Sequence, residues 1–481
     1  MSSQTISNEN QKSYSRTIIT NESQKSDSQT SDVNDYIGSG GFGKVFEVKG
    51  TNLVKKEMDL RYEENLREIC FLSTYKHIPF ITNLEKCEID EKNNTINMFM
   101  KHAGISIRDL SKTMKMEERI KLVPTLMIQF ARILIWMEQE NILHCDVKPA
   151  NICIDDELNV TMIDWGFVQR ILKNKKYKIG TQVFYDPYTF HDKINHNSEM
   201  FAFGISLCYF VLSGFDYDEW EDFCYEFDDK DTSTFKTDPD RLCELNEKAL
   251  DIIDIDKTLQ KFIDIHGTSD YFELLLEMIH IDPECRIDMK DLYNTFPIDL
   301  QIKYPLIECY THKYNNSMIS TKIPYEINDK ILYMVIDWMI SVKFTLSIKY
   351  SLLDAIKLLF LYLKKEKTIS SEIPSIATVC LYIATVINCE GVMDVAKCTM
   401  LCNIKSKTEI FVILKKVLTV LNYDVYPDKN NCEYPKRNED IWRLTLLNTQ
   451  KDLKNCKYIS LISHGLFDVL YCEKKKNKRN E

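Results

Sequence analysis

The chain has 481 residues, of which 44% are hydrophobic and 28% charged, and this length allows two or three domains that each bury a core. Its formal net charge of -11 argues against a general nucleic-acid-binding protein, so no specific nucleic-acid partner is expected. The basic run at 474–479 is expected to be a solvated tail. Sixteen cysteines are scattered without any Cys-x-x-Cys pair, which predicts reduced thiols in the cytoplasm or nucleus.

Residues 1–32 consist mainly of Ser, Asn, Gln, Thr and Lys, and they hold too few apolar side chains to offset the entropy of folding. A disordered polar tail is therefore expected there. The longest uncharged run, 373–389, is short for a membrane span and contains Pro, Ser, Thr and Asn. We expect a buried helix in this run and no membrane partner.

Order is expected from about residue 33, where a Gly-x-Gly-x-x-Gly pattern follows a short strand-like segment. Glycines let the backbone approach phosphate groups and offer amide donors without a Cβ in the way. The pattern alone also fits the phosphate-binding turn of a Rossmann fold. However, the residues after it predict two strands joined by a turn at 49–51, instead of a strand followed by a helix. We therefore expect a hairpin that covers phosphates, formed by Ile37, Gly38, Ser39, Gly40, Gly41, Phe42, Gly43, Lys44 and Val45.

Lys55 ends the second of these predicted strands, where its cation can bridge two phosphates. Such a cation needs an anion that fixes its position. Glu68 is the candidate, because Leu66, Ile69 and Leu72 form one apolar face of a predicted helix and Glu68 flanks that face. We expect an ion pair between Lys55 and Glu68.

The most informative stretch is 144–151, together with Asp164 beyond it. A carboxylate at Asp146, a lysine at Lys148, an amide at Asn151 and a second carboxylate at Asp164 suit phosphoryl transfer. An amide and a carboxylate can hold the metal ions that neutralise the transferred group. The other carboxylate can orient the attacking hydroxyl and accept its proton.

This block resembles the catalytic loop and the metal-binding motif of eukaryotic protein kinases, His-Arg-Asp-Leu-Lys-Pro-x-Asn and Asp-Phe-Gly. The resemblance implies that ATP binds under the glycine-rich hairpin and that Asn151 and Asp164 hold Mg²⁺. It also implies that Asp146 is the catalytic base and that Lys148 neutralises the γ-phosphate. A lysine at this position is the choice of serine/threonine kinases, which act on proteins.

Two positions depart from these motifs, namely Cys145 in place of Arg and Trp165 in place of Phe. Trp165 keeps an aromatic ring, and the resemblance implies that it stacks with His144 between the two lobes, with Leu72 above them. The segment around Glu68 resembles helix C of cyclin-dependent kinases.

Residues 164–188 resemble an activation segment that departs from the usual Ala-Pro-Glu ending, because Tyr188 replaces the Glu. In the family that Glu pairs with an Arg, which is Arg286 here. We therefore expect another carboxylate or the Tyr188 hydroxyl to satisfy Arg286. Glu199 replaces the Asp that begins the central helix of the large lobe.

Beyond a linker at 299–320, periodic apolar residues predict an all-helical bundle. The segments 335–339, 378–385 and 417–424 resemble three helix segments of a cyclin box. Cyclins contact helix C of their kinase through a Lys and a Glu. Val386 and Leu414 occupy these positions here, so the usual charged contacts are not expected.

The expected architecture is an α+β bilobal protein-kinase fold, followed by an all-α bundle similar to a cyclin box. The expected segments are a tail at 1–32, a kinase domain at 33–298, a linker at 299–320, a cyclin-like domain at 321–427 and a helical, basic tail at 428–481. Such kinase–cyclin fusions resemble proteins of giant DNA viruses, which implies a viral protein that acts inside a host cell.

Two functions stay open at this point. The first is an active kinase that phosphorylates protein substrates and carries its regulator in the same chain. The second is a catalytically weak scaffold whose cyclin-like domain recruits another kinase or a substrate as its protein partner.

Cys145 stands where the family has an Arg that binds a phosphate on the activation segment. This difference gives a first prediction. No Ser or Thr lies between Gly166 and Gly180, so neither the phosphate acceptor nor its usual Arg is present there. We predict that the active protein is not switched by Ser or Thr phosphorylation of this segment. Phosphosite mapping by mass spectrometry tests this, and a stoichiometric phosphate on a Ser or Thr within 164–188 that changes activity would contradict it.

Overall fold

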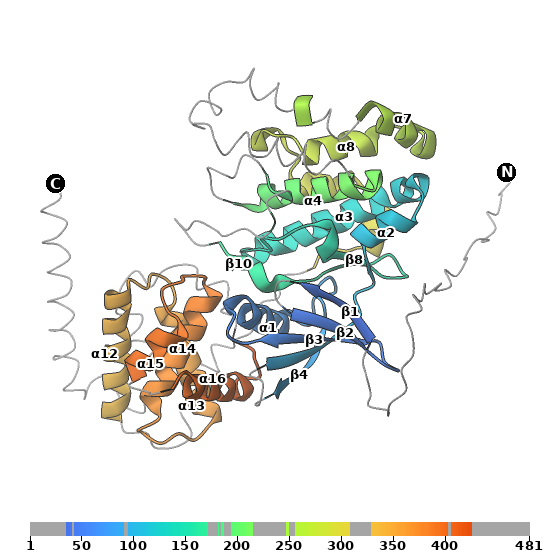
Figure 1. Ribbon diagram of the computed structural model, residues 1–481. Helices are drawn as coiled ribbons and strands as arrows, with labels where there is room; N and C mark the ends of the chain where they lie inside the picture. The colour runs from blue at the N-terminus through green and yellow to red at the C-terminus, as the bar shows by residue number, and fades with distance from the viewer. Residues whose placement is uncertain are drawn as a thin grey trace, which may run out of the picture.

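The computed structural model describes residues 35–40, 43–90, 95–171, 181, 184–186, 194–214, 247–249, 255–307, 329–402 and 406–425. The predicted tails at 1–32 and 428–481 and most of the predicted linker lie outside these residues. Three parts are visible: a small lobe built on a sheet, a large helical lobe, and a group of helices beside the small lobe (Figure 1). The predicted fold class, a bilobal α+β fold followed by an all-helical domain, is confirmed.

The small lobe is an antiparallel five-stranded sheet in the order β1-β2-β3-β5-β4. Its strands are β1 Asp35–Gly40, β2 Gly43–Val48, β3 Leu53–Asp59, β4 Leu84–Asp90 and β5 Thr95–Lys101. β1 and β2 pair from Asp35 opposite Glu47 to Gly40 opposite Gly43, so the glycine-rich segment is a hairpin as predicted. Gly41 and Phe42, at its tip, lie outside the described residues.

Alternation along β3 decides which of its side chains face the interior. Val54, Lys56 and Met58 are buried, whereas the residues between them are only half-buried. Successive side chains of a strand point to opposite faces, so Lys56 shares the inner face with two apolar neighbours. Helix α1 Glu63–Tyr75, which follows β3, packs beside this sheet (Figure 1).

The large lobe is helical, and α3 is its central element. Its helices are α2 Ile107–Thr113, α3 Met116–Glu140, α4 His196–Leu212, α7 Ile255–His266, α8 Asp270–Met278, α9 Met289–Thr295 and α10 Ile298–Lys303. Within the described residues α3 alone is long and apolar enough to cross a membrane, but 78% of its most apolar window is buried inside the fold. This burial is typical of a core helix.

In the described residues, short strands surround the predicted catalytic block, one of them before α2 and the others between α3 and α4. These are β6 Ile105–Ser106, β7 Ile142–Leu143, β8 Ile152–Ile154, β9 Val160–Met162 and β10 Gln169–Arg170. Helix α3 ends at Asn141, which adopts a left-handed conformation with φ of 58°. The Asn141 side-chain amide donates to the Ile171 carbonyl at 3.1 Å, so the end of α3 fixes the start of the activation segment.

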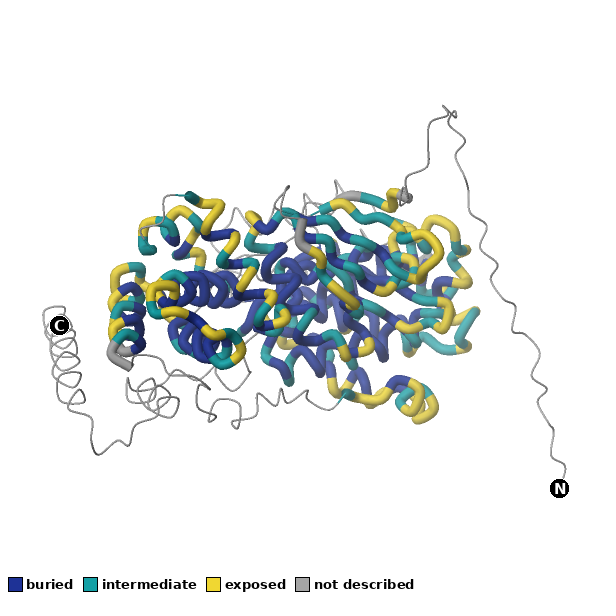
Figure 2. Tube along the Cα trace, turned by 90° about the horizontal axis from the view of Figure 1, so that it is seen from below, coloured by how far each residue is buried: buried dark blue, intermediate teal, exposed yellow. Residues whose placement is uncertain are grey.

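In the described residues the third part has five helices, and α14 is the central one. They are α12 Asp329–Leu346, α13 Leu352–Lys365, α14 Ile373–Ile387, α15 Val395–Cys402 and α16 Lys407–Val420. The predicted buried helix in 373–389 is α14, which packs against the other four helices. Seen from below, buried residues fill the middle of this group and exposed residues line its rim (Figure 2).

Helix α1 of the small lobe contacts this helical group directly. The Arg67 guanidinium donates from Nε to the Val386 carbonyl at 3.3 Å. Ser73 Oγ donates to the Asn422 carbonyl at 2.9 Å, and Thr74 Oγ1 donates to Asp424 Oδ1 at 3.1 Å. The contact therefore uses the backbone of Val386, not a charged side chain at that position.

Arg286 was expected to find a substitute carboxylate, and the structure confirms this expectation. Its guanidinium donates to both oxygens of Asp186, at 2.6 and 2.8 Å. Both side chains are almost completely buried, with exposed fractions of 0% and 1%. Tyr188, the other candidate, lies outside the described residues. The bidentate pair thus joins the end of the activation segment to the large lobe.

We predict that Asp186→Asn destabilises the large lobe by about 3 kcal/mol, because it leaves the buried Arg286 guanidinium without a counter-charge. The exposed pair between Lys290 and Glu138, 2.9 Å apart, provides the control. Glu138→Gln is expected to change stability by less than about 1 kcal/mol, because exposed ion pairs contribute little. Thermal unfolding of both variants measures the difference, and equal melting temperatures would contradict the prediction.

Candidate active site

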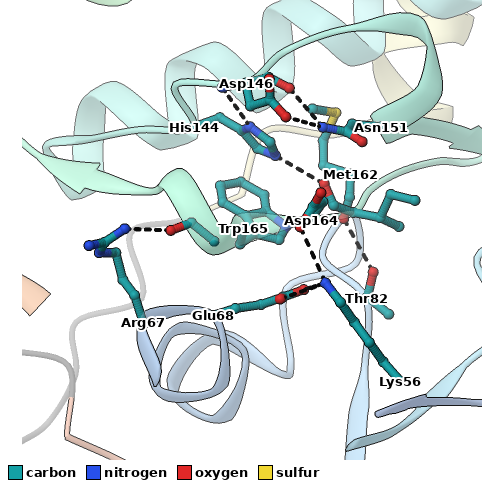
Figure 3. Close-up of polar contacts among 12 residues, drawn as sticks. Lys56, Arg67, Glu68, Thr82, His144, Asp146, Asn151, Met162, Asp164 and Trp165 are labelled. Atoms are coloured by element: carbon teal, nitrogen blue, oxygen red, sulfur yellow. Dashed lines mark hydrogen bonds and ion pairs between the residues drawn. The ribbon is translucent and has the colours of Figure 1, made fainter. Parts of the chain in front are cut away.

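Lys56 is the cation at the centre of the candidate site (Figure 3). Its Nζ lies 2.8 and 2.7 Å from the two carboxylate oxygens of Glu68 and 3.2 Å from Oδ1 of Asp164. Burial by itself lowers the pKa of Lys56, but the two carboxylates more than offset this effect, so that its pKa is raised. The ammonium group is therefore charged, and it joins β3, α1 and the segment after β9.

The predicted pair between Lys55 and Glu68 is wrong by one residue. Lys55 lies on the opposite face of β3, where its Nζ is 3.7 Å from Glu57 and 4.8 Å from the centre of the Phe46 ring. The alternation of strand side chains contained the signal that identifies Lys56. Because Val54 is a core residue, the residue two positions further on, Lys56, shares its face.

Asp146 lies in a cluster of four polar side chains. Its Oδ2 accepts from the Asn151 amide at 2.9 Å and lies 2.8 Å from Lys148 Nζ. Its Oδ1 accepts from Thr181 Oγ1 at 2.8 Å, and Lys148 Nζ in turn contacts Thr181 Oγ1 at 2.9 Å. Asp146, Lys148 and Asn151, which the sequence analysis selected, are thus brought together. Thr181 was not selected, although it stands in the Gly-Thr pair of the activation-segment pattern.

The backbone at Cys145 is held in an unusual conformation just before Asp146. Cys145 has φ of 62°, in the left-handed region that costs about 1–3 kcal/mol for a residue other than Gly. Its N–H donates to Glu199 Oε1 at 2.7 Å, and its carbonyl accepts from the Tyr185 hydroxyl at 3.3 Å. Burial raises the pKa of Glu199 to about 8, whereas its backbone hydrogen bonds lower it. These two contacts fix the peptide that directs Asp146 toward the cluster.

Aromatic rings connect the catalytic block to helix α1. The His144 and Trp165 rings lie 4.4 Å apart, as the sequence analysis predicted. Burial lowers the pKa of His144, and the neutral ring donates from Nε2 to the Ile163 carbonyl at 3.1 Å. Phe71 of α1 stacks on Trp165 with ring centres 4.4 Å apart. Helix α1 thus contributes the Phe71 ring to this stack. Phe71 is the residue before Leu72, which the sequence analysis selected.

Asn151 and Asp164 fit the coordination chemistry of Mg²⁺. The Asn151 amide nitrogen donates to the carbonyl and the carboxylate of Asp146, both at 2.9 Å, which fixes the orientation of the amide group. Amide and carboxylate oxygens are the hard ligands that Mg²⁺ prefers. No group of three or more His, Cys, Asp or Glu side chains suitable for a metal occurs in the described part of the chain. The residues therefore suit an ion held jointly by protein oxygens and substrate phosphates.

Known proteins are similar to this chain over part of its length. A cAMP-dependent protein kinase catalytic subunit of Dictyostelium discoideum is 28% identical over 190 residues, which cover 37% of this chain and 29% of that protein. A putative serine/threonine-protein kinase/receptor of Acanthamoeba polyphaga mimivirus is 29% identical over 36% of this chain and 11% of its own length. A G-type lectin S-receptor-like serine/threonine-protein kinase of Arabidopsis thaliana is 26% identical over 39% of this chain and 27% of its own. The chain thus spans less than a third of the length of these curated relatives.

Two family models match the chain in succession. The protein kinase domain model matches residues 31–296, and the cyclin N-terminal domain model matches residues 306–426. Because the first match covers more than half of the 481 residues, this chain belongs to the protein kinase family, and a cyclin-type N-terminal domain follows its kinase domain.

Proposed function

We propose that this chain is an ATP-dependent protein serine/threonine kinase whose cyclin-like domain acts on the kinase domain of the same chain. The observation that carries this proposal is the contact of Lys56 with both Glu68 and Asp164. Bringing three charged groups together in a largely buried site is costly unless it serves binding or catalysis, because each charge loses its hydration. A scaffold without activity has no need for this arrangement.

The chemistry assigned to the site follows from its geometry. The glycine-rich hairpin covers the phosphates of ATP, and Lys56 contacts them with an ammonium that Glu68 keeps in place. Asn151 and Asp164 would hold Mg²⁺, and the ion would supply positive charge that neutralises the phosphoryl group. Asp146 orients the attacking hydroxyl and takes up its proton, while the new bond from its oxygen to the γ-phosphorus forms and the bond from that phosphorus to the departing ADP breaks.

Lys148 and Thr181 support a serine or threonine side chain as the acceptor. Lys148 places a positive charge 2.8 Å from the Asp146 carboxylate, where it can also meet the γ-phosphate. The Thr181 hydroxyl, bonded to both Asp146 and Lys148, restricts the orientation of the two side chains. The proposed substrates are therefore hydroxyl groups of proteins, and the three relatives named above bear the word kinase in their own names.

The cyclin-like domain is proposed to act in the manner of a cyclin, through helix α1. This helix presents Glu68 to Lys56 and, at the adjacent position, Arg67 to the Val386 carbonyl. Covalent fusion keeps the effective concentration of the two domains high, so a modest interface is sufficient. The resemblance to kinase–cyclin fusions of giant DNA viruses stays a prediction.

Substituting each of two adjacent lysines tests which of them serves the reaction. Lys56→Met is expected to lower the rate of phosphate transfer from ATP by at least about 100-fold, because it removes a preorganised charge at the reacting phosphates. Lys55→Met, the matched control, is expected to stay within about threefold of wild type, since its loss affects a half-exposed ion pair outside the Lys56 contact. Transfer of labelled γ-phosphate to a general protein substrate measures both. Equal losses in the two variants would contradict the assignment of Lys56.

Removal of a metal ligand tests the proposed enzyme as a whole. Asp164→Ala is expected to abolish magnesium-dependent phosphate transfer, because one of the two proposed Mg²⁺ ligands is lost. Asp156→Ala, which removes an exposed carboxylate nearby, is expected to retain wild-type rates. If wild type and Asp164→Ala transfer phosphate equally slowly, the chain is a scaffold and not a kinase.

A further inference from the structure

The chain just beyond Asp164 is held by the Arg67 side chain of α1. The Gly166 carbonyl accepts from Arg67 at 2.5 Å, and the same guanidinium reaches the Val386 carbonyl of the cyclin-like domain. Further along, β10 lies at the end of the large lobe that faces the helical group (Figure 1). Arg170 in β10 extends into that group. The start of the activation segment therefore lies against two domains at once.

Arg170 forms a buried ionic contact with the cyclin-like domain. Its Nη1 lies 3.5 Å from Asp354 Oδ2 and donates to Asn388 Oδ1 at 3.4 Å. The exposed fractions of Arg170, Asp354 and Asn388 are 2%, 6% and 1%. Burial of a guanidinium is tolerated only when an opposite charge and hydrogen bonds compensate for lost hydration. Asp354 supplies that charge from another domain of the same chain.

A second layer of hydrogen bonds fixes the Asp354 carboxylate. The Asn388 amide donates to Asp354 Oδ2 at 3.0 Å and to Ser351 Oγ at 3.3 Å. Ser351 Oγ donates to Glu390, whose carboxylate also accepts from the backbone N–H groups of residues 349 and 350 at 2.6 and 2.8 Å. This network ties the start of α13 to the end of α14. The carboxylate is thus preorganised before it meets Arg170.

β10 connects Arg170 to the catalytic loop because it pairs with β7, the strand before that loop. Arg170 pairs with Ile142 and Gln169 pairs with Leu143 across the two-stranded sheet of β10 and β7. β7 leads directly into His144, and Asp146 follows two residues later. A displacement of Arg170 therefore moves the strand from which the catalytic loop begins.

We propose that Asp354 is a positioning residue that anchors the start of the activation segment through Arg170 and makes phosphorylation of that segment unnecessary. A phosphate serves this purpose where an Arg precedes the catalytic Asp, but Cys145 occupies that place and no Ser or Thr lies between Gly166 and Gly180. The permanent carboxylate of Asp354 supplies a comparable negative charge. The catalytic part of this proposal rests on the proposed kinase function, whereas the anchoring does not.

Asp354→Asn in the full-length chain tests the anchor, because it removes the charge while an amide oxygen can still accept from Asn388. Amide hydrogen exchange in peptides that cover 164–171 is expected to accelerate by about tenfold. The control is Glu366→Gln, which breaks an exposed pair with Lys416 in the same domain and is expected to leave exchange unchanged. Unchanged exchange in Asp354→Asn would overturn the proposal whether or not the chain transfers phosphate.

Steady-state kinetics separates positioning from general damage. In Asp354→Asn, kcat is expected to fall by about tenfold while KM for ATP changes by less than about twofold, because Lys56 and the glycine-rich hairpin are untouched. Arg170→Ala is expected to cause a similar fall, and the double variant is expected to be no slower than either single variant. If the losses in kcat of the two single variants multiply in the double variant, the two side chains are not directly coupled and the proposal is overturned. A wild-type chain that transfers no phosphate, but shows the exchange difference, would overturn the proposed function and keep the anchor.

Discussion

The ammonium group of Lys56 is the point on which the two lobes and helix α1 depend. A charge in this largely buried place requires compensation, and in the described part of the chain Glu68 from α1 and Asp164 from the segment after β9 give it. The sheet therefore fixes where α1 stands and where the Asp164 carboxylate points. The ring stack of Phe71, Trp165 and His144 also joins α1 to the segment after β9, so apolar packing supports the same arrangement as the ionic contact.

Two adjacent residues of α1 contact different parts of the molecule. Glu68 contacts Lys56, whereas Arg67 bonds to the carbonyls of Gly166 and Val386. At Arg67 the cyclin-type domain meets α1 with a backbone acceptor, which tolerates a valine at the position where cyclins carry a charge.

The sequence was sufficient to predict that Asp146, Lys148 and Asn151 lie together, because their spacing matches one motif. It was also sufficient to predict that Arg286 pairs with another carboxylate, because a buried guanidinium requires a counter-charge. It placed the lysine that pairs with Glu68 one residue too early, because motif spacing does not distinguish two adjacent lysines. The alternation of Val54 and Lys56 would have corrected this.

Other contacts were beyond reach for a different reason. The bond of Thr181 to Asp146 and the approach of Asp354 to Arg170 join residues far apart in the chain, and no local pattern predicts either contact. Their positions are set by how whole domains pack. Domain packing depends on complementary surfaces that a single sequence does not display as a periodic signal.

The position of α1 between two sites gives the molecule a thermodynamic symmetry. If a bound nucleotide favours the position of α1 in which Lys56 contacts Glu68, the same position of α1 favours the hydrogen bond from Arg67 to the Val386 carbonyl. Linkage requires that each event strengthens the other by the same factor. Because the cyclin-type domain cannot diffuse away, this coupling appears as a change in rigidity of the whole chain, not as recruitment of a partner.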